Sequence, residues 1–172
     1  NDGNGNFGAP TFFDGGVGGE YGLHTSDMNN DAIMDLVVAG RNDETIRSLL
    51  GNGNGTFTGG AVQDAGGNPW VVAVGDLDGD GDLDATTANS FDANGAVLFN
   101  DGTGNFSAPV VYGSDGHTPS TDLGDLDGDG DLDWILSVFG PPSKWIMFEN
   151  DGSGSFTEVE EFTAPANPSC AV

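Results

Sequence analysis

Hydrophobic residues in this chain occur in short runs of about one strand's length, separated by turns rich in glycine, asparagine and aspartate. One run, residues 70–75 (WVVAVG), is apolar throughout, which is typical of a strand buried on both faces. Three more strands are predicted at residues 83–89, 95–100 and 105–112. Together the four segments predict a unit of short strands joined antiparallel, so the fold class is all-β.

An acidic nonapeptide shows that this unit is repeated. The sequence DLDGDGDLD at residues 76–84 recurs letter for letter at residues 125–133, and a looser copy, DMNNDAIMD, occupies residues 27–35. The first residues of the three copies are 49 positions apart each time. A fixed period of this length is the signature of a repeat architecture.

A second motif keeps nearly the same period. Asn-Asp-Gly or a relative of it, followed by another glycine and then phenylalanine, ends at Phe7, Phe57, Phe106 and Phe156, with spacings of 50, 49 and 50 residues. Glycine and asparagine tolerate a positive φ, so the motif predicts hairpin turns. We expect the phenylalanine after each turn to point into a core.

Three complete units are expected, at about residues 20–64, 69–112 and 118–162. Four-stranded units with two apolar faces can bury both faces by stacking radially around an axis, which predicts the blades of a β-propeller. Residues 6–13 align with a fourth strand and form an expected leading strand without a local sheet. The repeat region covers residues 1–163, and residues 164–172 form a C-terminal tail.

Three blades cannot close a ring. The chain is therefore expected either to be part of a larger propeller or to be completed by another copy through its open edges. Self-association of this kind is one expected partnership.

The acidic loops predict metal sites. Carboxylates at alternating positions of a loop converge only if a cation cancels their charge, and Ca²⁺ suits flexible loops with oxygen ligands better than Mg²⁺. Position 7 is expected to contribute its backbone carbonyl, and about one Ca²⁺ per loop is expected, three in all. The predicted ligands are Asp27, Asn29, Asp31, Ile33 and Asp35; Asp76, Asp78, Asp80, Asp82 and Asp84; and Asp125, Asp127, Asp129, Asp131 and Asp133.

The first loop is expected to bind most weakly. Asn29 replaces aspartate at position 3, and Ala32 replaces the glycine that permits a sharp turn at position 6. An EF-hand is excluded, because it needs glutamate at position 12, where this chain has Val38, Thr87 or Leu136. Solvated acidic turns without metal are the simpler alternative, but three copies in register favour a site.

Charge narrows the choice of partner. The chain has 28 acidic residues and three basic ones, for a net charge of −25, which excludes binding to a nucleic acid backbone as a main role. The apolar runs are too short to insert into a membrane.

Cys170 is the single cysteine, so it cannot form an internal disulfide. Carboxylate sites of moderate affinity point to surroundings with near-millimolar calcium, outside the cell or on its surface.

No catalytic constellation is apparent, so the chain is not expected to be an enzyme. His24 and His117 are not at equivalent positions of their repeats and are interpreted as unrelated loop residues rather than a zinc or catalytic pair.

Tryptophan offers flat faces on which sugars can stack. Trp70 and Trp134 are expected to pack in the interior, because Trp70 opens an apolar strand and Trp134 follows a metal loop. Trp145 occupies, by the 49-residue period, the place of Ala96 and Arg47, and this variation makes it a candidate ligand-binding residue.

The two motifs together resemble the FG-GAP/VCBS repeat family, whose best-known members are the propellers of integrin α-subunits. The resemblance rests on D-x-[DN]-x-D-[GA]-x-x-D, on N-D-G-x-G-x-F, and on FGAP at residues 7–10 and FSAP at residues 106–109. It extends to about Phe162. It implies a propeller, usually of about seven blades, with calcium in the acidic loops.

These observations predict a non-catalytic extracellular module for adhesion or for recognition of a protein or glycan. Two alternatives remain open. One is a structural subunit of an extracellular filament or sheath, assembled by completion of strands or blades between copies. The other is the accessory propeller of a secreted polysaccharide-degrading enzyme.

Overall fold

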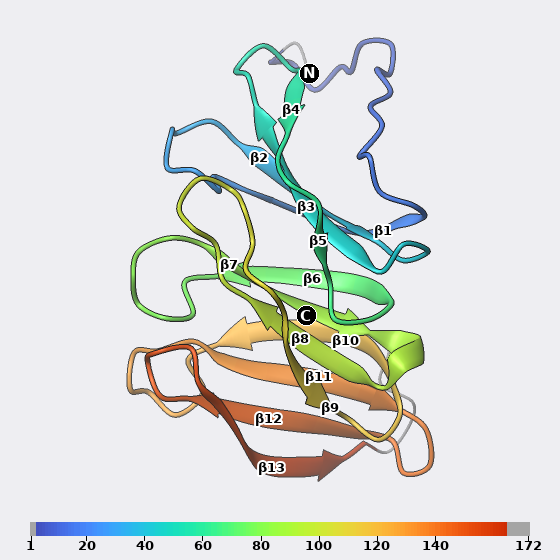
Figure 1. The fold of residues 1–172 in the computed structure, drawn as a ribbon, viewed down its shortest axis with the longest axis vertical. Coiled ribbons are helices and arrows are strands. Elements are labelled where there is room, and N and C mark those ends of the chain that lie inside the picture. Colours follow the sequence, from blue (N-terminus) through green and yellow to red (C-terminus); the bar gives the residue numbers. More distant parts are fainter. Residues whose placement is uncertain (1–2, 165–172) are drawn as a thin grey trace.

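The structure, a computed structural model, describes residues 3–164 and consists of three antiparallel sheets stacked one on another (Figure 1). The first sheet has the order β1-β2-β3-β4, with β5 also paired to β3. Its strands are β1 (Glu20–Ser26), β2 (Asp35–Gly40), β3 (Thr45–Gly51), β4 (Phe57–Gly59) and β5 (Gln63–Asp64).

The second and third sheets are regular four-stranded units with the orders β6-β7-β8-β9 and β10-β11-β12-β13. The second contains β6 (Pro69–Gly75), β7 (Asp84–Asn89), the short 3₁₀ turn η1 (Ser90–Asp92), β8 (Asn94–Leu98) and β9 (Val110–Gly113). The third contains β10 (His117–Gly124), β11 (Asp133–Phe139), β12 (Lys144–Asn150) and β13 (Phe156–Thr163). The predicted four-stranded antiparallel blades are thus confirmed, and the described residues contain no α-helix.

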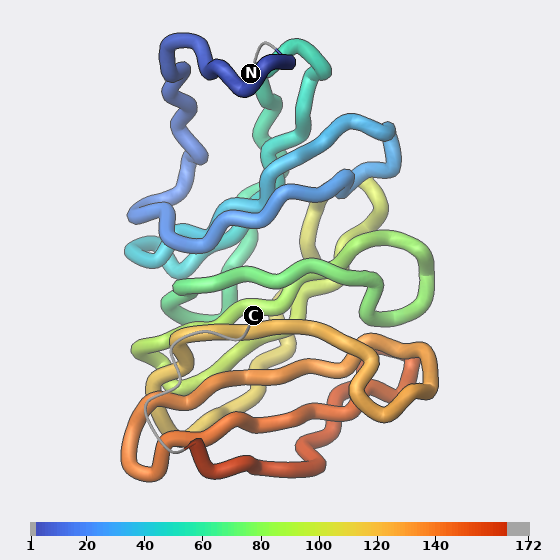
Figure 2. The backbone as a smooth tube through the Cα atoms, turned by 180° about the vertical axis from the view of Figure 1, so that it is seen from behind, coloured from blue at the N-terminus to red at the C-terminus, as the bar shows by residue number. Residues whose placement is uncertain are grey.

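Two apolar layers hold the blades together. The layer between the first and second blades includes Val37, Ile46 and Leu98. The layer between the second and third blades is built around Trp134, which is fully buried as predicted and stacks on Phe148 with ring centroids 4.8 Å apart. Each blade therefore buries an apolar face only because another blade lies against it. The stacking of the three sheets is clear in both Figure 1 and Figure 2.

Gly95 illustrates how closely the second and third blades approach. A Cβ atom at this position would lie 2.6 Å from Cζ2 of Trp134. The glycine is required by this contact, because a side chain would collide with the indole ring.

Residues 6–13 do not form the expected strand. A strand needs a neighbour to bond its backbone N–H and C=O groups, but the adjacent edge strand β4 has only three residues, and Pro10 lacks an N–H group. Phe7 and Phe12 are exposed, and only Phe13 packs, edge-on to Phe57 with ring centroids 5.4 Å apart.

The fourth strands of the first two blades are also shorter than predicted. In the first blade β4 and β5 both pair with β3, and residues 60–62 interrupt them. In the second blade only Val110–Gly113 forms a strand, and Asn100 and Phe106 form an isolated bridge. Pro109 cannot donate to the ladder, which ends the pairing there.

The position assigned to Trp145 was wrong. Trp145 pairs with Ser137, whereas Gly95 pairs with Ala88 at the corresponding place in the second blade. Trp145 therefore matches Gly95, and not Ala96, because the chain from Ser137 to Trp145 is one residue longer than the chain from Ala88 to Gly95.

Some expectations fall outside the described residues. Cys170 and nearly all of the C-terminal tail lie in residues 165–172, which the structure does not describe. Among the described residues, no helix has the length and apolar character needed to cross a membrane.

Candidate metal centres

Each acidic loop joins the first and second strands of a blade. The loops lie between β1 and β2, between β6 and β7, and between β10 and β11, on one side of the stack, the left side in Figure 1. Because each first strand ends where its loop begins, the three repeats present equivalent loops along the same side.

Three carboxylates converge in each of the two identical loops. In the second blade these are Asp76, Asp78 and Asp84, each with an oxygen within 4.8 Å of the others; Asp125, Asp127 and Asp133 form the same group in the third blade. Two oxygens that share one Ca²⁺ ion lie at most about 5 Å apart, since each is roughly 2.3–2.6 Å from the ion. The predicted positions 1, 3 and 9 therefore have a separation that fits calcium.

Positions 5 and 7 are not part of these groups. Asp80 and Asp129 each accept a backbone N–H two residues ahead, from Asp82 and Asp131, at 2.9 Å. At position 7, the Asp82 side chain accepts a hydrogen bond from Asn30 Nδ2 at 2.7 Å. This side chain is engaged with the neighbouring blade, so only the backbone carbonyl of position 7 remains as the predicted ligand.

The first loop is built differently. Within the described residues no three carboxylates of this loop converge as they do in the other two. Asn29 Nδ2 donates to Asp31 at 3.1 Å. Position 1 is alike in the first and second loops, because both oxygens of Asp27 accept backbone N–H groups, as do both oxygens of Asp76. Asn29 offers one neutral oxygen where the other loops offer a carboxylate.

The turn geometry explains the glycine at position 6. Gly81 and Gly130 have φ values of 92° and 105°, and Ala32 at the same position of the first loop has a φ of 64°. This left-handed conformation costs a residue with a Cβ roughly 1–2 kcal/mol. The first loop thus follows the same path at a higher conformational cost.

The aspartate at position 9 has a role that the sequence analysis missed. Asp35, Asp84 and Asp133 are all buried. Asp84 accepts a backbone N–H from Leu77 on one oxygen, at 3.0 Å, and from Asn100 on the other, at 2.8 Å. The same pair of bonds forms in the other blades, from Met28 and Gly51 to Asp35 and from Leu126 and Asn150 to Asp133. This carboxylate ties the acidic loop to the end of the third strand in every blade.

The acidic loops also connect neighbouring blades. Asn100, which opens the turn of the second blade, donates from Nδ2 to the carbonyl of Met28 at 2.7 Å, and Asn150 donates to the carbonyl of Leu77 at 2.8 Å. Met28 and Leu77 are both buried in the layers between blades. The turn motif and the acidic loop keep the same period because each turn holds the loop of the preceding blade.

The electrostatics of the second loop favour a bound cation. Burial raises the pKa of Asp84 to about 6, although the backbone N–H groups of Asn100 and Leu77 act in the opposite direction. Burial and the nearby charges of Asp80 and Asp76 also raise the pKa of Asp78. A divalent ion would remove this penalty, because it stabilises the ionised carboxylates.

The other candidate residues lie away from the acidic loops. His24 lies within β1 and His117 begins β10, so neither is a loop residue as interpreted from the sequence, and the described residues show no metal-ligating group that contains either. Trp145 is partly exposed on the outer face of the third blade, between Ser137 and Phe162. Its predicted role as a ligand-binding residue stays a prediction.

Solved structures share this fold. A chain of the Photorhabdus luminescens Tc holotoxin pore matches with 22% sequence identity and a TM-score of 0.50. The match covers 83% of the present chain and 7% of the toxin chain. The structure of BBS1N in complex with ARL6DN matches with 13% sequence identity and a TM-score of 0.59. The match covers 92% of the present chain and 49% of the matched chain. Both contain propellers, and at these identities the likeness concerns the fold alone. This chain spans less than half the length of either.

No curated protein matches the chain in sequence. The FG-GAP-like repeat family matches residues 27–87, which contain the first two acidic loops and the strands between them. The chain therefore carries an FG-GAP-like repeat over residues 27–87, as its motifs indicated.

Proposed function

We propose that this protein is a non-catalytic, calcium-stabilised β-propeller module that acts outside the cell in adhesion or in recognition of a protein or glycan. The observation that carries the proposal is the convergence of three carboxylates in each of two loops. In a chain with a net charge of −25, such groups repel one another unless a cation neutralises them.

Calcium has a structural role in this proposal. The ion binds positions 1, 3 and 9 of the loop, and position 9 is the aspartate that holds the end of the third strand. In the first two loops the residue after position 1, Met28 or Leu77, is buried against the next blade. Binding therefore stabilises the layers between blades as well as each loop, and carboxylate sites of this kind are filled where calcium is near millimolar, as it is outside cells.

The test is calcium titration followed by calorimetry, with thermal unfolding in excess calcium and in excess EGTA. At a calcium concentration of 100 Kd each filled site adds about 2.7 kcal/mol to the free energy of unfolding. We expect Asp78→Asn and Asp127→Asn each to remove one binding event. The control is Glu149→Gln, which removes an exposed charge outside the loops and leaves the titration unchanged.

Equal melting temperatures in calcium and EGTA would contradict the structural role of calcium. Wild-type titration curves for both loop variants would contradict the assignment of the ligands. No catalytic turnover is expected from the isolated chain, and an assay on plant or algal polysaccharides tests this.

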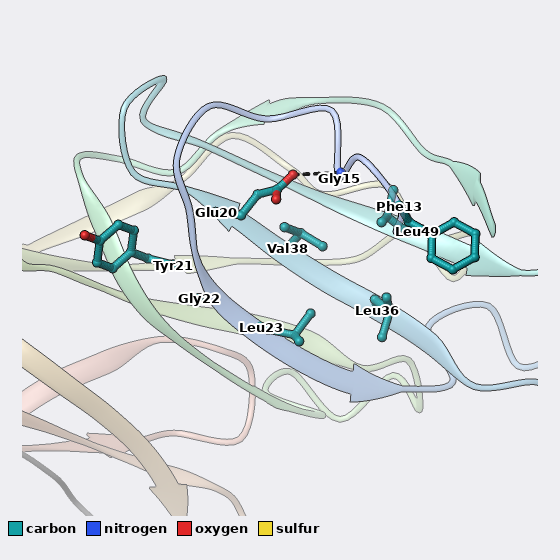
Figure 3. A pocket seen from close by; sticks show the side chains of 9 residues that line it. All are labelled: Phe13, Gly15, Glu20, Tyr21, Gly22, Leu23, Leu36, Val38 and Leu49. Carbon is teal, nitrogen blue, oxygen red and sulfur yellow. Dashed lines mark hydrogen bonds between the residues drawn. The ribbon is translucent and has the colours of Figure 1, made fainter. Parts of the chain in front are cut away.

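Assembly into a filament or sheath is the second candidate, and one observation favours it. The outer face of the first blade carries a pocket of about 380 Å³, where Leu23 and Phe13 are exposed (Figure 3). On the outer face of the third blade, Phe162 is also exposed. Exposed apolar faces at both ends of a stack are suited to association with further blades.

Sedimentation velocity in calcium distinguishes the two functions. Assembly predicts concentration-dependent association that Leu23→Asp abolishes and that Phe7→Asp, at an exposed residue that does not line this pocket, leaves intact. A monomer at every concentration would exclude self-assembly of this chain.

A further inference from the structure

Four aromatic side chains line the side of the stack opposite the acidic loops. They are Tyr21, Trp70, Phe91 and His117, and with Arg41 they are called the aromatic rim below. Consecutive ring centroids lie 5.6, 5.6 and 5.2 Å apart. Three of the residues stand at or near the start of β1, β6 and β10, and Phe91 belongs to η1, so the rim joins all three blades.

Two of these side chains belong to residues where the pairing of the strands is irregular. The pairing of β1 with β2 shifts between Glu20 and Gly22, and the pairing of β6 with β7 shifts between Pro69 and Val71. Tyr21 and Trp70 are the residues at these irregularities. Bulges commonly re-aim a side chain beside a binding site.

The rim is open to solvent. Tyr21 is 57% exposed, Phe91 is 54% exposed, and His117 is also exposed. Trp70, expected from the sequence to be an interior residue, is only partly buried. Exposed aromatic rings gathered in one place mark an interaction site more strongly than the same rings scattered singly.

Arg41 stands at the centre of the rim. Its Cζ atom lies 5.1 Å from the ring centroid of Tyr21, 5.3 Å from that of Trp70 and 4.8 Å from that of Phe91. Its Nε donates to Asn68 Oδ1 at 3.1 Å, and Asn68 Nδ2 donates to the Arg41 carbonyl at 2.5 Å. Asn68 thus holds both the guanidinium and the backbone of Arg41.

This cation has no carboxylate partner. In the part of the chain that the structure describes, the ion pairs join Lys144 to Asp115 and Glu161, and none involves Arg41. The chain has 28 acidic residues and three basic ones, so the missing partner is not explained by a shortage of carboxylates. The two terminal nitrogens of Arg41 can form the planar fork that binds a carboxylate bidentately.

A purely structural role explains only part of this arrangement. Arg41 belongs to the first blade and stacks on Trp70 and Phe91 of the second, so it helps to hold the two blades together. That role does not require half-exposed rings at Tyr21 and Phe91 or a guanidinium without a carboxylate.

The chemistry of the rim fits a sugar that carries a carboxylate. The face of an aromatic ring is electrically negative and attracts the polarised C–H groups on the flat side of a pyranose. The carboxylate of a uronic acid meets the guanidinium beside those rings. An acidic peptide could satisfy Arg41 but has no flat C–H face for the neighbouring rings.

The negative charge of the acidic loops does not prevent this binding. The loops begin where β1, β6 and β10 end, at the far end of strands of seven or eight residues. Such strands span roughly 20 Å or more, and charges are screened over about 8 Å at physiological ionic strength.

We propose that the aromatic rim binds a uronate-bearing saccharide, with Arg41 bound to the sugar carboxylate and Tyr21 and Phe91 packed on the sugar rings. This inference rests on the proposed recognition function and names its site and ligand class.

The test uses the calcium-loaded protein and trigalacturonate as the probe, with affinity measured by calorimetry. We expect measurable binding that weakens as salt is raised. Its methyl ester, which lacks the charge, should bind at least tenfold more weakly, because a charge-assisted bidentate contact is lost. Arg41→Gln should cause a loss of the same size.

Two further variants separate the site from general effects of substitution. Phe91→Ala, which removes a half-exposed ring, should weaken binding severalfold even if the Arg41 variant is poorly folded. Phe12→Ala removes a phenylalanine that is 89% exposed and lies outside the rim, and it should bind as the wild type does.

The proposal is overturned if trigalacturonate does not bind, if the methyl ester binds equally well, or if Arg41→Gln binds unchanged. Binding lost in Asp78→Asn but kept in Arg41→Gln would place the sugar on calcium and overturn it too. Arg41-dependent binding of hexaglutamate, without sugar binding, would replace it with a protein partner. The comparison of thermal unfolding in calcium and in EGTA does not depend on any of these binding results. Failure of the calcium proposal can therefore be told apart from failure of the saccharide proposal.

Discussion

The acidic loops of the first and second blades have the same anchor but different ligand groups. In both, the aspartate at position 9 is buried and accepts two backbone N–H groups. Only the second brings three carboxylates together, because Asn29 stands where Asp78 stands. The comparison separates two roles within one motif: position 9 holds the blade, while position 3 decides whether a third carboxylate joins the group.

The largest expected effect comes from removing the anchor. Asp35→Ala and Asp84→Ala each leave two buried N–H groups without an acceptor, which should cost roughly 2–5 kcal/mol of unfolding free energy. Urea unfolding in EGTA should give similar losses for both variants, because the anchor is the same.

In excess calcium, Asp84→Ala should cost more than Asp35→Ala, because it also removes a ligand of the stronger site. Glu149→Gln should stay within about 0.5 kcal/mol of the wild type under both conditions. A negligible loss for Asp35→Ala would show that the two loops do not share an anchor.

A smaller effect is expected from pH in the absence of calcium. The pKa of Asp84 is raised to about 6 from an ordinary value near 3.8, so its stabilising contribution is fully present below pH 3.8 and is lost as the pH rises through 6. The EGTA-treated protein should therefore be more stable at pH 5 than at pH 7. Thermal unfolding at the two pH values measures this difference.

Calcium should oppose the trend, because it stabilises the ionised carboxylate. In Asp84→Asn without calcium, the stability difference between pH 5 and pH 7 should shrink. An unchanged difference in this variant would assign the pH dependence to other groups.

The next effect in size is expected when the first loop is converted into a copy of the second. Asn29→Asp combined with Ala32→Gly restores the third carboxylate and the glycine of the turn. We expect calcium affinity at this loop to rise about tenfold, equivalent to roughly 1.4 kcal/mol. Titration in an Asp78→Asn, Asp127→Asn background isolates the first site, and an unchanged affinity would show that position 3 does not control binding.

The smallest effect is expected from Ala32→Gly alone in EGTA. Relief of the left-handed conformation at Ala32 contributes roughly 1–2 kcal/mol, and the greater freedom of glycine in the unfolded chain cancels about 0.4–1 kcal/mol. A net gain of about 0.5 kcal/mol in urea unfolding is expected. Destabilisation would mean that Ala32 is not strained.

Much of the fold could be predicted because its signals are local. Apolar runs, turn glycines and a constant period identified the blades, and position 6 was correctly expected to need a sharp turn. The register of Trp145 could have been corrected from the sequence, since the acidic loops are 49 residues apart while Phe106 and Phe156 are 50 apart. The extra residue lies between the third acidic loop and β12.

Other features depend on contacts between distant residues. The expected strand at residues 6–13 did not form, because pairing needs a long neighbouring edge that the first blade does not offer. The bonds from Asn100 to Met28 and from Asn150 to Leu77 join residues more than 70 positions apart. No local pattern shows that a turn holds the loop of the previous blade.

The sequence by itself determined the repeat, the strand-and-turn pattern and the loops in which carboxylates meet, because the turn within one nine-residue loop brings its side chains close together. Only the tertiary structure decided that position 9 anchors the third strand, that the loops connect blades, and that Tyr21, Arg41, Trp70, Phe91 and His117 form one surface. Those contacts arise when separate blades stack, and burial of their apolar faces drives that stacking.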